Sequence, residues 1–395
     1  MRVSPLFMFY LAGLSVLGLL AIDMYLPAFS VMQQQMNASS GQISLSLSIF
    51  LAGYAIAQLI WGQLSDKYGR KPILLVGLSM FSLSCLAMIW IDSVAGLLIL
   101  RLIQAIGVCA AAVCWQALVI DRYPVHVTNR VLATIMPLVA LSPALAPTLG
   151  AWLLMHTGWR SIFVILSICG LILIVATLFI HEVKKIRVSS SSNVLNKKKN
   201  NYWTLLSSNI FIGNVLIYAA CSASFFAWLT GSPFILSKMG YSSTDIGLSY
   251  IPQTLAFLIG GYGYRIFAGQ ALGQMLLPWL LVIYAICMAA MVMMSFFGEP
   301  TLLMLFIPFC TTALVNGAIY PIVVASALTP FSDDSGKAAA LQNTIQLSFC
   351  FIASMMVSIF LVSALKTTVT VMFATVIVVL IGFIWRRIPH KQAVV

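Results

Sequence analysis

The sequence predicts an all-α polytopic membrane protein with twelve transmembrane helices in two six-helix bundles. Three observations support this prediction: the chain is strongly apolar, its apolar residues form runs long enough to cross a bilayer, and its basic residues gather between these runs. Of its residues, 61% are hydrophobic and 8% are charged, whereas soluble domains carry about 25% charged residues. Because so few charges cannot cover a water-facing surface, most of the chain must face lipid or other helices.

The apolar runs mark the expected spans, since a transmembrane helix needs about 20 mostly apolar residues. The spans expected in the first half are 6–31, 43–64, 73–91, 95–120, 130–154 and 161–180. Those expected in the second half are 210–236, 246–267, 275–297, 301–328, 337–364 and 368–386. The first run is too long for a signal peptide and lacks a clear small-residue cleavage site, so we expect it to remain as a helix.

A polar, basic and serine-rich stretch separates the two sets of spans. Such a composition cannot bury a core, which predicts a cytoplasmic linker. We therefore expect an N-terminal six-helix bundle over 1–180, a basic linker over 181–209 and a C-terminal six-helix bundle over 210–395. Transporters built from two such halves bind their substrate between them.

The placement of lysine and arginine predicts the orientation. With a cytoplasmic N-terminus, only Arg160, Lys238 and Lys366 fall outside, Arg101 lies within a span, and every other basic residue falls inside. This asymmetry follows the positive-inside rule and predicts an even number of spans with both termini in the cytoplasm. The net charge of +12 arises from these loops rather than from a basic surface interleaved with aromatics, which excludes nucleic-acid binding.

Cysteine and histidine placement argues against an enzyme. The eight cysteines lie inside apolar runs, where small buried hydrophobes are expected rather than disulfides or metal ligands. The four histidines do not cluster, and no metal-binding helix or nucleophile elbow is present. We therefore expect no enzyme activity, no cofactor and no metal. A channel or receptor is disfavoured because neither a repeated filter nor a set of lining charges is present, which leaves a carrier of small molecules.

Asp23 is the only acidic residue well inside an expected span. A charge at mid-membrane costs about 2.5–3.5 kcal/mol on insertion scales. A carboxyl in such a place can exchange a proton as its access to water changes, which is what proton coupling requires. The alternative is a structural acid bonded to hydroxyl or backbone groups that never titrates. Pro27 follows one turn later, so we expect a kink or unwinding close to the acid.

Arg101 is the matching basic residue, in the fourth expected span. Its guanidinium stays charged at physiological pH, so it could stabilise an ionised Asp23 if the two lie close together. The sequence does not establish that they touch. The alternative is an arginine near the helix end that extends its charge to the membrane interface.

Two further stretches of sequence contain residues that we expect to control how helices turn, bend or pack. The loop between the second and third spans contains Gly62, Asp66, Gly69, Arg70 and Lys71. We expect Gly62 to permit close helix approach, Gly69 to form a tight turn, Asp66 to pair with a cation or cap a helix, and the basic residues to hold the loop inside.

The fifth expected span carries three prolines, Pro137, Pro143 and Pro147, followed by Gly150. Prolines break the backbone hydrogen-bond ladder, and the small residues between them permit tight helix packing. One interpretation is a helix that bends and forms a watertight contact between the halves, and the alternative is an ordinary kinked helix.

Together these strings resemble the major facilitator superfamily, in its twelve-helix drug:proton antiporter branch. The loop over 62–71 is similar to the signature between the second and third helices. Arg101 with Gln104 and Gly107 is similar to the fourth-helix motif. The stretch over 143–150 is similar to the antiporter motif of the fifth helix, although Ser142 stands where glycine is usual.

The string Asp23–Ala28 resembles the first-helix hallmark of the Bcr/CflA drug-resistance family. This resemblance implies the major facilitator fold, a proton gradient as the energy source and a monomer in a bacterial inner membrane. The strings 115–118, 218–228, 316–321 and 340–343 resemble purine nucleoside carriers of this family. They imply a purine nucleoside such as adenosine or inosine as substrate, with multidrug efflux by drug:proton antiport as the alternative.

Amide and aromatic side chains within the spans are the candidate substrate contacts. They are Gln58, Gln104, Trp115, Gln116, Asn214, Tyr218, Phe225, Trp228, Asn316, Tyr320, Gln342, Asn343 and Gln346. Amides can hydrogen-bond base edges and ribose hydroxyls, and aromatic faces can stack on bases. Any single one could instead join helices or anchor the interface. Because charges are scarce in the spans, a neutral or cationic solute fits better than a nucleotide.

Overall fold

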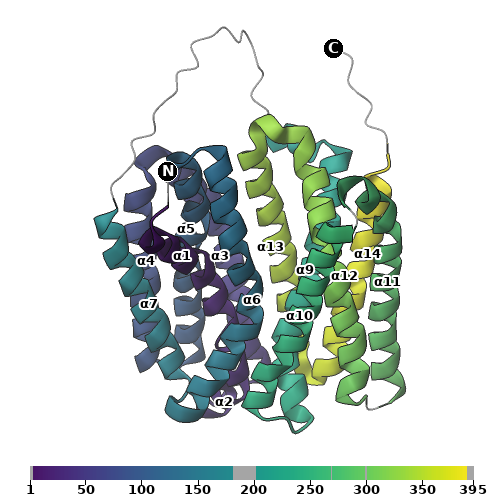
Figure 1. The fold of residues 1–395 in the computed structure, drawn as a ribbon. Coiled ribbons are helices and arrows are strands. Elements are labelled where there is room, and N and C mark those ends of the chain that lie inside the picture. The colour runs from purple at the N-terminus through teal and green to yellow at the C-terminus, as the bar shows by residue number, and fades with distance from the viewer. Residues whose placement is uncertain (1–2, 181–201, 268, 299, 389–395) are drawn as a thin grey trace.

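The computed structural model describes residues 3–180, 202–267, 269–298 and 300–388, and its regular elements in these ranges are all helical (Figure 1). The first half contains α1 (Pro5–Asp23), a 3-10 turn η1 (Leu26–Ala28), α2 (Phe29–Gln35), α3 (Ser40–Tyr68), α4 (Arg70–Ala87), η2 (Met88–Trp90), α5 (Val94–Arg122), α6 (Val125–Thr157) and α7 (Arg160–Phe179). The second half contains α8 (Tyr202–Leu206), α9 (Asn209–Lys238), α10 (Ser243–Phe267), α11 (Gly269–Phe297), α12 (Leu302–Leu328), η3 (Thr329–Asp334), α13 (Ser335–Ile359), η4 (Leu361–Ser363) and α14 (Ala364–Trp385).

Each expected span corresponds to a helix. Within the described residues, eleven helical segments are long and apolar enough to cross a membrane. The remaining expected span corresponds to α10, which has 25 residues and is therefore about 37 Å long at 1.5 Å per residue. This length exceeds the hydrocarbon core of about 30 Å, and polar residues such as Asp245, Gln253 and Arg265 make α10 less apolar than its neighbours.

Local signals in the sequence set several helix ends. Ser39 and Gln42 form a capping box at the start of α3, each bonding the other's backbone N–H. The Ser93 hydroxyl accepts from the backbone of Gly96 at the start of α5. Gly69, with φ of 95°, ends α3 in a conformation that other residues rarely adopt, which confirms the expected tight turn.

The helices form two groups that lie side by side (Figure 1). In the first group α3 and α4 pack against α5, and α1 packs against α6. In the second group α9 packs against α14, and α12 packs against α10 and α11. Contacts between the groups run mainly from α3 to α13 and from α6 to α10. The substrate site expected between two halves would therefore be bordered by these four helices.

The two ends of the molecule differ. Helix α1 begins and α14 finishes at one end, and α2 lies at the opposite end, which we call the α2 end (Figure 1). The expected linker over 181–209 lies outside the described residues as far as residue 201, and its last part contains the short helix α8. Helix α8 packs against α9 and α13, so this part of the stretch belongs to the second helical group.

The outer surface of the helices is apolar. On α7, the side chains of Ile168, Leu171, Ile172 and Val175 are all exposed. A row of exposed aliphatic side chains along a helix of a large protein is typical of contact with lipid.

Candidate functional site

The candidate proton site lies where α1 ends. Helix α1 finishes at Asp23, and the chain continues through Met24 and Tyr25 into the 3-10 turn that contains Pro27, which confirms the expected unwinding. The Asp23 side chain is buried, with 3% of its surface exposed. No described residue forms an ion pair or a hydrogen bond with its carboxyl. The structural alternative, a carboxyl tied to hydroxyl or backbone groups, is therefore absent from the described contacts.

Helix α6 packs directly on the turn that follows Asp23. A side-chain Cβ built at Gly150 would lie 1.7 Å from the Met24 carbonyl oxygen, so only glycine allows this contact. One turn earlier in α6, the Pro147 carbonyl oxygen lies 2.9 Å from the position of a Cβ at Gly247 of α10. The Pro147–Gly150 segment therefore lies between the Asp23 turn in one half and α10 in the other.

Helix α6 itself is continuous. It runs from Val125 to Thr157 through Pro137, Pro143 and Pro147, so the prolines do not divide it as the sequence would allow. The Thr148 hydroxyl donates to the Ala144 carbonyl at 2.8 Å, within the stretch whose backbone bonding the prolines reduce. The prolines thus leave an unbroken helix with fewer internal hydrogen bonds.

Arg101 is fully buried in α5, so its charge does not extend to the surface of the protein. Its Nη1 donates to the carbonyl oxygen of Ala21 at 3.0 Å and to the side-chain oxygen of Gln104. Its guanidinium lies 4.0 Å from the ring centre of Tyr25 and 4.3 Å from that of Phe50. These contacts place a permanent cation against the last turn of α1.

Asp23 and Arg101 share neighbours without touching. No ion pair joins them, although Arg101 bonds the backbone of α1 two residues before the acid. Tyr25 follows Asp23 by two residues, its ring lies against the Arg101 guanidinium, and its hydroxyl is 3.2 Å from the Ser46 hydroxyl. Two guanidinium nitrogens, Nε and Nη2, meet no described acceptor, so Arg101 retains hydrogen-bonding capacity in this conformation.

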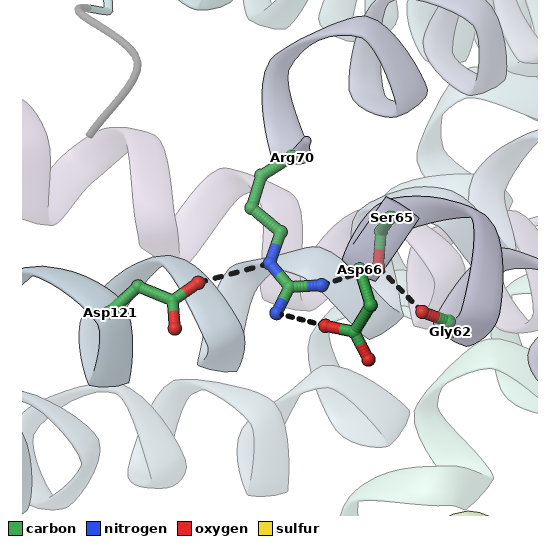
Figure 2. Close-up of polar contacts among 5 residues, drawn as sticks. All are labelled: Gly62, Ser65, Asp66, Arg70 and Asp121. Carbon is green, nitrogen blue, oxygen red and sulfur yellow. Dashed lines mark hydrogen bonds and ion pairs between the residues drawn. The ribbon is translucent and has the colours of Figure 1, made fainter. Parts of the chain in front are cut away.

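A second polar cluster, drawn in Figure 2, lies where α3 and α5 end and α4 begins, at the end opposite α2. Arg70, at the start of α4, forms ion pairs with Asp66 of α3 at 2.7 Å and with Asp121 of α5 at 3.1 Å. It also donates to the Ser65 hydroxyl, which in turn donates to the Gly62 carbonyl at 3.0 Å. The cluster joins the ends of three helices of the first half, and it confirms that Asp66 pairs with a cation.

Two residues of the same loop behave differently from each other. Lys71 donates to the carbonyl oxygens of Leu178 and Ile180 at the end of α7, at 2.7 and 3.0 Å. Gly62 was expected to permit close helix approach, but no atom lies within 4 Å of a Cβ built there. In this conformation that expectation is wrong, because the space beside Gly62 is open.

Several second-half candidates converge on Tyr320 of α12. The Tyr218 ring of α9 meets the Tyr320 ring edge-on at 4.9 Å between centres, and the Phe257 ring of α10 lies 5.6 Å away. The Ser222 hydroxyl donates to the Tyr320 hydroxyl at 3.1 Å. Asn316 lies one turn before Tyr320, and its buried side-chain oxygen has no described partner.

Unpaired buried amides also occur on α3, α10 and α13. The Gln58 and Gln342 side-chain oxygens and the Gln253 side-chain nitrogen are buried without a described partner. A buried amide without a hydrogen bond costs free energy, so such groups require a partner that a ligand could supply. On α13, Asn343 is half-buried, and Gln346 makes only a long contact of 3.8 Å to the Cys350 sulfur.

Other candidate substrate contacts already pack against rings or form hydrogen bonds within the protein. Trp228 packs against Phe309 at 4.6 Å between ring centres, and Phe225 lies against Phe226. The Asn214 amide donates to the Ile210 carbonyl and accepts from Arg386. These contacts favour structural roles for Trp228 and Asn214.

The first-half candidates divide in the same way. Gln104 accepts from Arg101 and donates to the Cys85 sulfur at 2.9 Å, so its amide supports the arginine. Trp115 is buried at 5% exposure, whereas Gln116 beside it is exposed on the outer surface of α5.

Several partners could not be found from the sequence alone. Asp121 and Phe50 are ordinary residues in their own segments, and they become significant only because folding places them against Arg70 and Arg101. The acid at the end of the fourth span was the one available signal for Asp121.

The sequence matches a known protein family and several individual proteins. The family model described as Major Facilitator Superfamily matches residues 11–354. The chain is 27% identical over 387 residues to an uncharacterized MFS-type transporter, YdgK, of Bacillus subtilis, covering 95% of this chain and 94% of that protein. It is 28% identical over 262 residues to a bicyclomycin resistance protein homolog of Haemophilus influenzae, covering 65% of each. It is 30% identical over 276 residues to a chloramphenicol resistance protein of Pseudomonas aeruginosa, covering 68% of this chain and 62% of that protein.

Solved structures give the same fold. A bacterial homolog of the human lysosomal transporter Spinster, in an inward-facing and unoccupied conformation, superimposes with a TM-score of 0.77 at 14% identity, covering 98% of this chain and 97% of that one. A D-xylose-proton symporter superimposes with a TM-score of 0.76 at 16% identity, covering 98% and 99%. The fold is therefore the twelve-helix transporter fold expected from the sequence, and the chain belongs to the major facilitator superfamily.

Proposed function

We propose that the protein is a proton-coupled antiporter that moves small drug-like organic molecules across a bacterial inner membrane. The observation that carries this proposal is Asp23, a buried carboxyl at the end of α1 with no described ion-pair or hydrogen-bond partner. Relatives named for bicyclomycin and chloramphenicol resistance support the drug class. The protein would act as a monomer without a cofactor, using the proton gradient for energy.

Proton coupling would work through the surroundings of Asp23. Burial disfavours the charged form, so Asp23 binds a proton readily where water is excluded and releases it where water or a cation stabilises the anion. Arg101 bonds the same turn of α1 and keeps two N–H-bearing nitrogens unpaired. A small movement of the Asp23 turn toward Arg101 would therefore favour loss of the proton.

The substrate would bind between the halves. The unpaired amides Asn316, Gln342 and Gln253 and the ring pair Tyr218–Tyr320 supply hydrogen bonds and aromatic faces without charge. This chemistry suits a neutral or cationic solute. A purine nucleoside such as adenosine or inosine is the second candidate, favoured by the same combination of amides and aromatic rings.

The orientation follows from the basic residues, with both termini in the cytoplasm. The α2 end then faces outside, and the cluster of Arg70, Asp66 and Asp121 faces the cytoplasm. Because α3 approaches α13 closely at Gly41 and α6 approaches α10 closely at Gly247, both toward the α2 end, we interpret this conformation as inward-facing. Alternating access would require the α2 end to open and the Gly62 region to close.

Transport in proteoliposomes tests the coupling. We expect wild-type protein to accumulate or extrude substrate under an imposed pH gradient, and the variant Asp23→Asn to lose at least about tenfold in gradient-driven rate, because the amide cannot exchange a proton. The variant should still exchange labelled substrate across the membrane without a gradient, which controls for folding. Unimpaired gradient-driven transport by Asp23→Asn would remove this residue from the mechanism.

The same assay tests the substrate. Chloramphenicol and adenosine should be tested as competitors in parallel, since the one that fails to compete is excluded as substrate.

A further inference from the structure

Buried hydroxyl groups bridge the two halves near the α2 end. The Ser48 hydroxyl of α3 lies 2.7 Å from the Ser354 hydroxyl of α13 and 3.3 Å from the Ser358 hydroxyl. The Ser354 hydroxyl also lies 2.8 Å from the Thr230 hydroxyl of α9. These four side chains, which we call the hydroxyl cluster, connect one helix of the first half with two helices of the second.

The cluster is shielded from water. Ser48, Ser354 and Thr230 have no exposed surface, and Ser358 is 3% exposed. Hydrogen bonds in such surroundings do not compete with water, and breaking one leaves polar groups that must find another partner. The cluster therefore favours the closed arrangement of these three helices.

Two members of the cluster also donate a hydrogen bond within their own helix. The Thr230 hydroxyl donates to the Phe226 carbonyl at 2.7 Å, and the Ser358 hydroxyl donates to the Ser354 carbonyl at 2.9 Å. Serine and threonine in helices commonly bond the carbonyl four residues earlier. If α3 moves away from α13, the Thr230 and Ser358 hydroxyls keep these hydrogen bonds within their own helices. Opening of the contact therefore leaves fewer buried hydroxyls without a partner.

Backbone packing at the same place depends on a small residue. A Cβ at Gly41 would lie 2.5 Å from the Ser358 carbonyl oxygen, so α3 and α13 approach closely there. Gly41 precedes Ser48 by seven residues, which places both on one face of α3. The contact of α6 with α10 at Gly247 lies toward the same end, and so does the ring contact of Phe29 with Phe234 at 5.6 Å.

The geometry points to a latch: we propose that the hydrogen bonds of Ser48 to Ser354 and Ser358 hold the two halves together at the α2 end, with Thr230 positioning Ser354 from within the second half. The bonds of Ser48 must break for this end to open. The proposal rests on the two-state transport cycle given as the proposed function. The cluster contains no titratable group, so it sets the balance between closed and open states without sensing protons itself. Its strength would therefore determine how often the α2 end opens.

Distance measurements between spin labels test the latch without substrate or a pH gradient. Labels at Gln34→Cys and Lys238→Cys, two exposed positions on opposite halves of the α2 end, report its opening. We expect Ser354→Ala, which removes the common partner of Ser48 and Thr230, to raise the population with long distances at least about threefold. The matched control is Ser84→Ala, since Ser84 is equally buried but bonds only the Phe81 carbonyl of its own helix. An unchanged distance distribution in Ser354→Ala would overturn the proposal.

A cross-link provides a second test in case Ser354→Ala folds poorly. In the double variant Ser48→Cys/Ser354→Cys, the sulfurs would occupy positions now 2.7 Å apart, close enough for a disulfide. We expect oxidation to hold the α2 end closed, to abolish transport and to be reversed by a thiol reductant. Full transport by the oxidised protein would contradict the latch. Because the distance measurement needs no proton coupling, its result stands apart from that of Asp23→Asn.

Discussion

At the scale of single residues, Arg101 illustrates how a permanent charge is kept inside an apolar bundle. The guanidinium lies between the rings of Tyr25 and Phe50 and bonds Gln104 and the Ala21 carbonyl. A desolvated cation–π contact is worth about 2 kcal/mol, and a hydrogen bond to a charged group about 1.5–3 kcal/mol. These contacts offset part of the cost of removing the charge from water. Arg101 is therefore held in place by geometry that suits a planar guanidinium.

This geometry predicts that lysine cannot replace Arg101. The variant Arg101→Lys keeps the charge but loses the planar stack and the forked donor arrangement, so we expect a loss of about 2 kcal/mol in stability and strongly reduced proton-coupled transport. Thermal unfolding in detergent and gradient-driven uptake would measure the two effects. Arg122→Lys in the same helix is the control, because Arg122 is exposed and lies 5.0 Å from the centre of the Phe7 ring. Equal effects in both variants would contradict a special role for Arg101.

The two charged residues could be found from the sequence, but their surroundings could not. Asp23 and Arg101 are each the single charge of their sign deep within an expected span, and this rarity is visible without a fold. The ring of Phe50, by contrast, is one of 23 phenylalanines in the chain, and only folding selects it as the partner of Arg101. The same holds for the serines and the threonine of the hydroxyl cluster, which are common residues on three separate helices.

At the scale of helices, the contact between α6 and the Asp23 turn links the proton site to the interface between halves. Gly150 touches the Met24 carbonyl, and Pro147, one turn earlier, touches α10 at Gly247. A displacement of the Asp23 turn would therefore be passed to α10 through this continuous helix. The glycine is required because any side chain would occupy the position of the Met24 oxygen.

We therefore predict that Gly150→Ala disrupts transport. The added Cβ would lie 1.7 Å from the Met24 oxygen, so either α6 or the Asp23 turn must shift. We expect a loss of about 1–3 kcal/mol in thermal stability and a larger fractional loss of coupled transport. Gly263→Ala in α10 is the matched control, since no atom lies within 4 Å of a Cβ there, and it should be tolerated. Normal transport by Gly150→Ala would show that the contact does not matter.

The helices could be predicted to within a few residues at most ends, because apolar runs and caps are local properties. The turn after Asp23 could be predicted from Pro27. The uninterrupted course of α6 could not, because prolines permit a kink without requiring one, and neighbouring helices decide the outcome. The open space beside Gly62 could not be predicted either, since it depends on how the neighbouring helices pack around α3.

At the scale of the whole molecule, the two halves meet differently at the two ends. Near the α2 end, the hydroxyl cluster, the contact at Gly247 and the ring pair Phe29–Phe234 connect the halves. At the other end, the ion pairs of Arg70 lie within the first half and join its own helices. These contacts connect the halves toward the α2 end, which is an arrangement that rocking of one half against the other can use.

The last prediction concerns which side of the membrane the α2 end faces. If both termini are cytoplasmic, the α2 end faces outside, and a membrane-impermeant maleimide added to intact cells should label Gln34→Cys but not Gln63→Cys. Both side chains are exposed glutamines, one in α2 and one near the end of α3, so they differ only in the side of the membrane. The unmodified protein is the background control, because its eight cysteines are buried or half-buried. Permeabilised cells should label both variants, and labelling of Gln63→Cys alone in intact cells would reverse the orientation and make this conformation outward-facing.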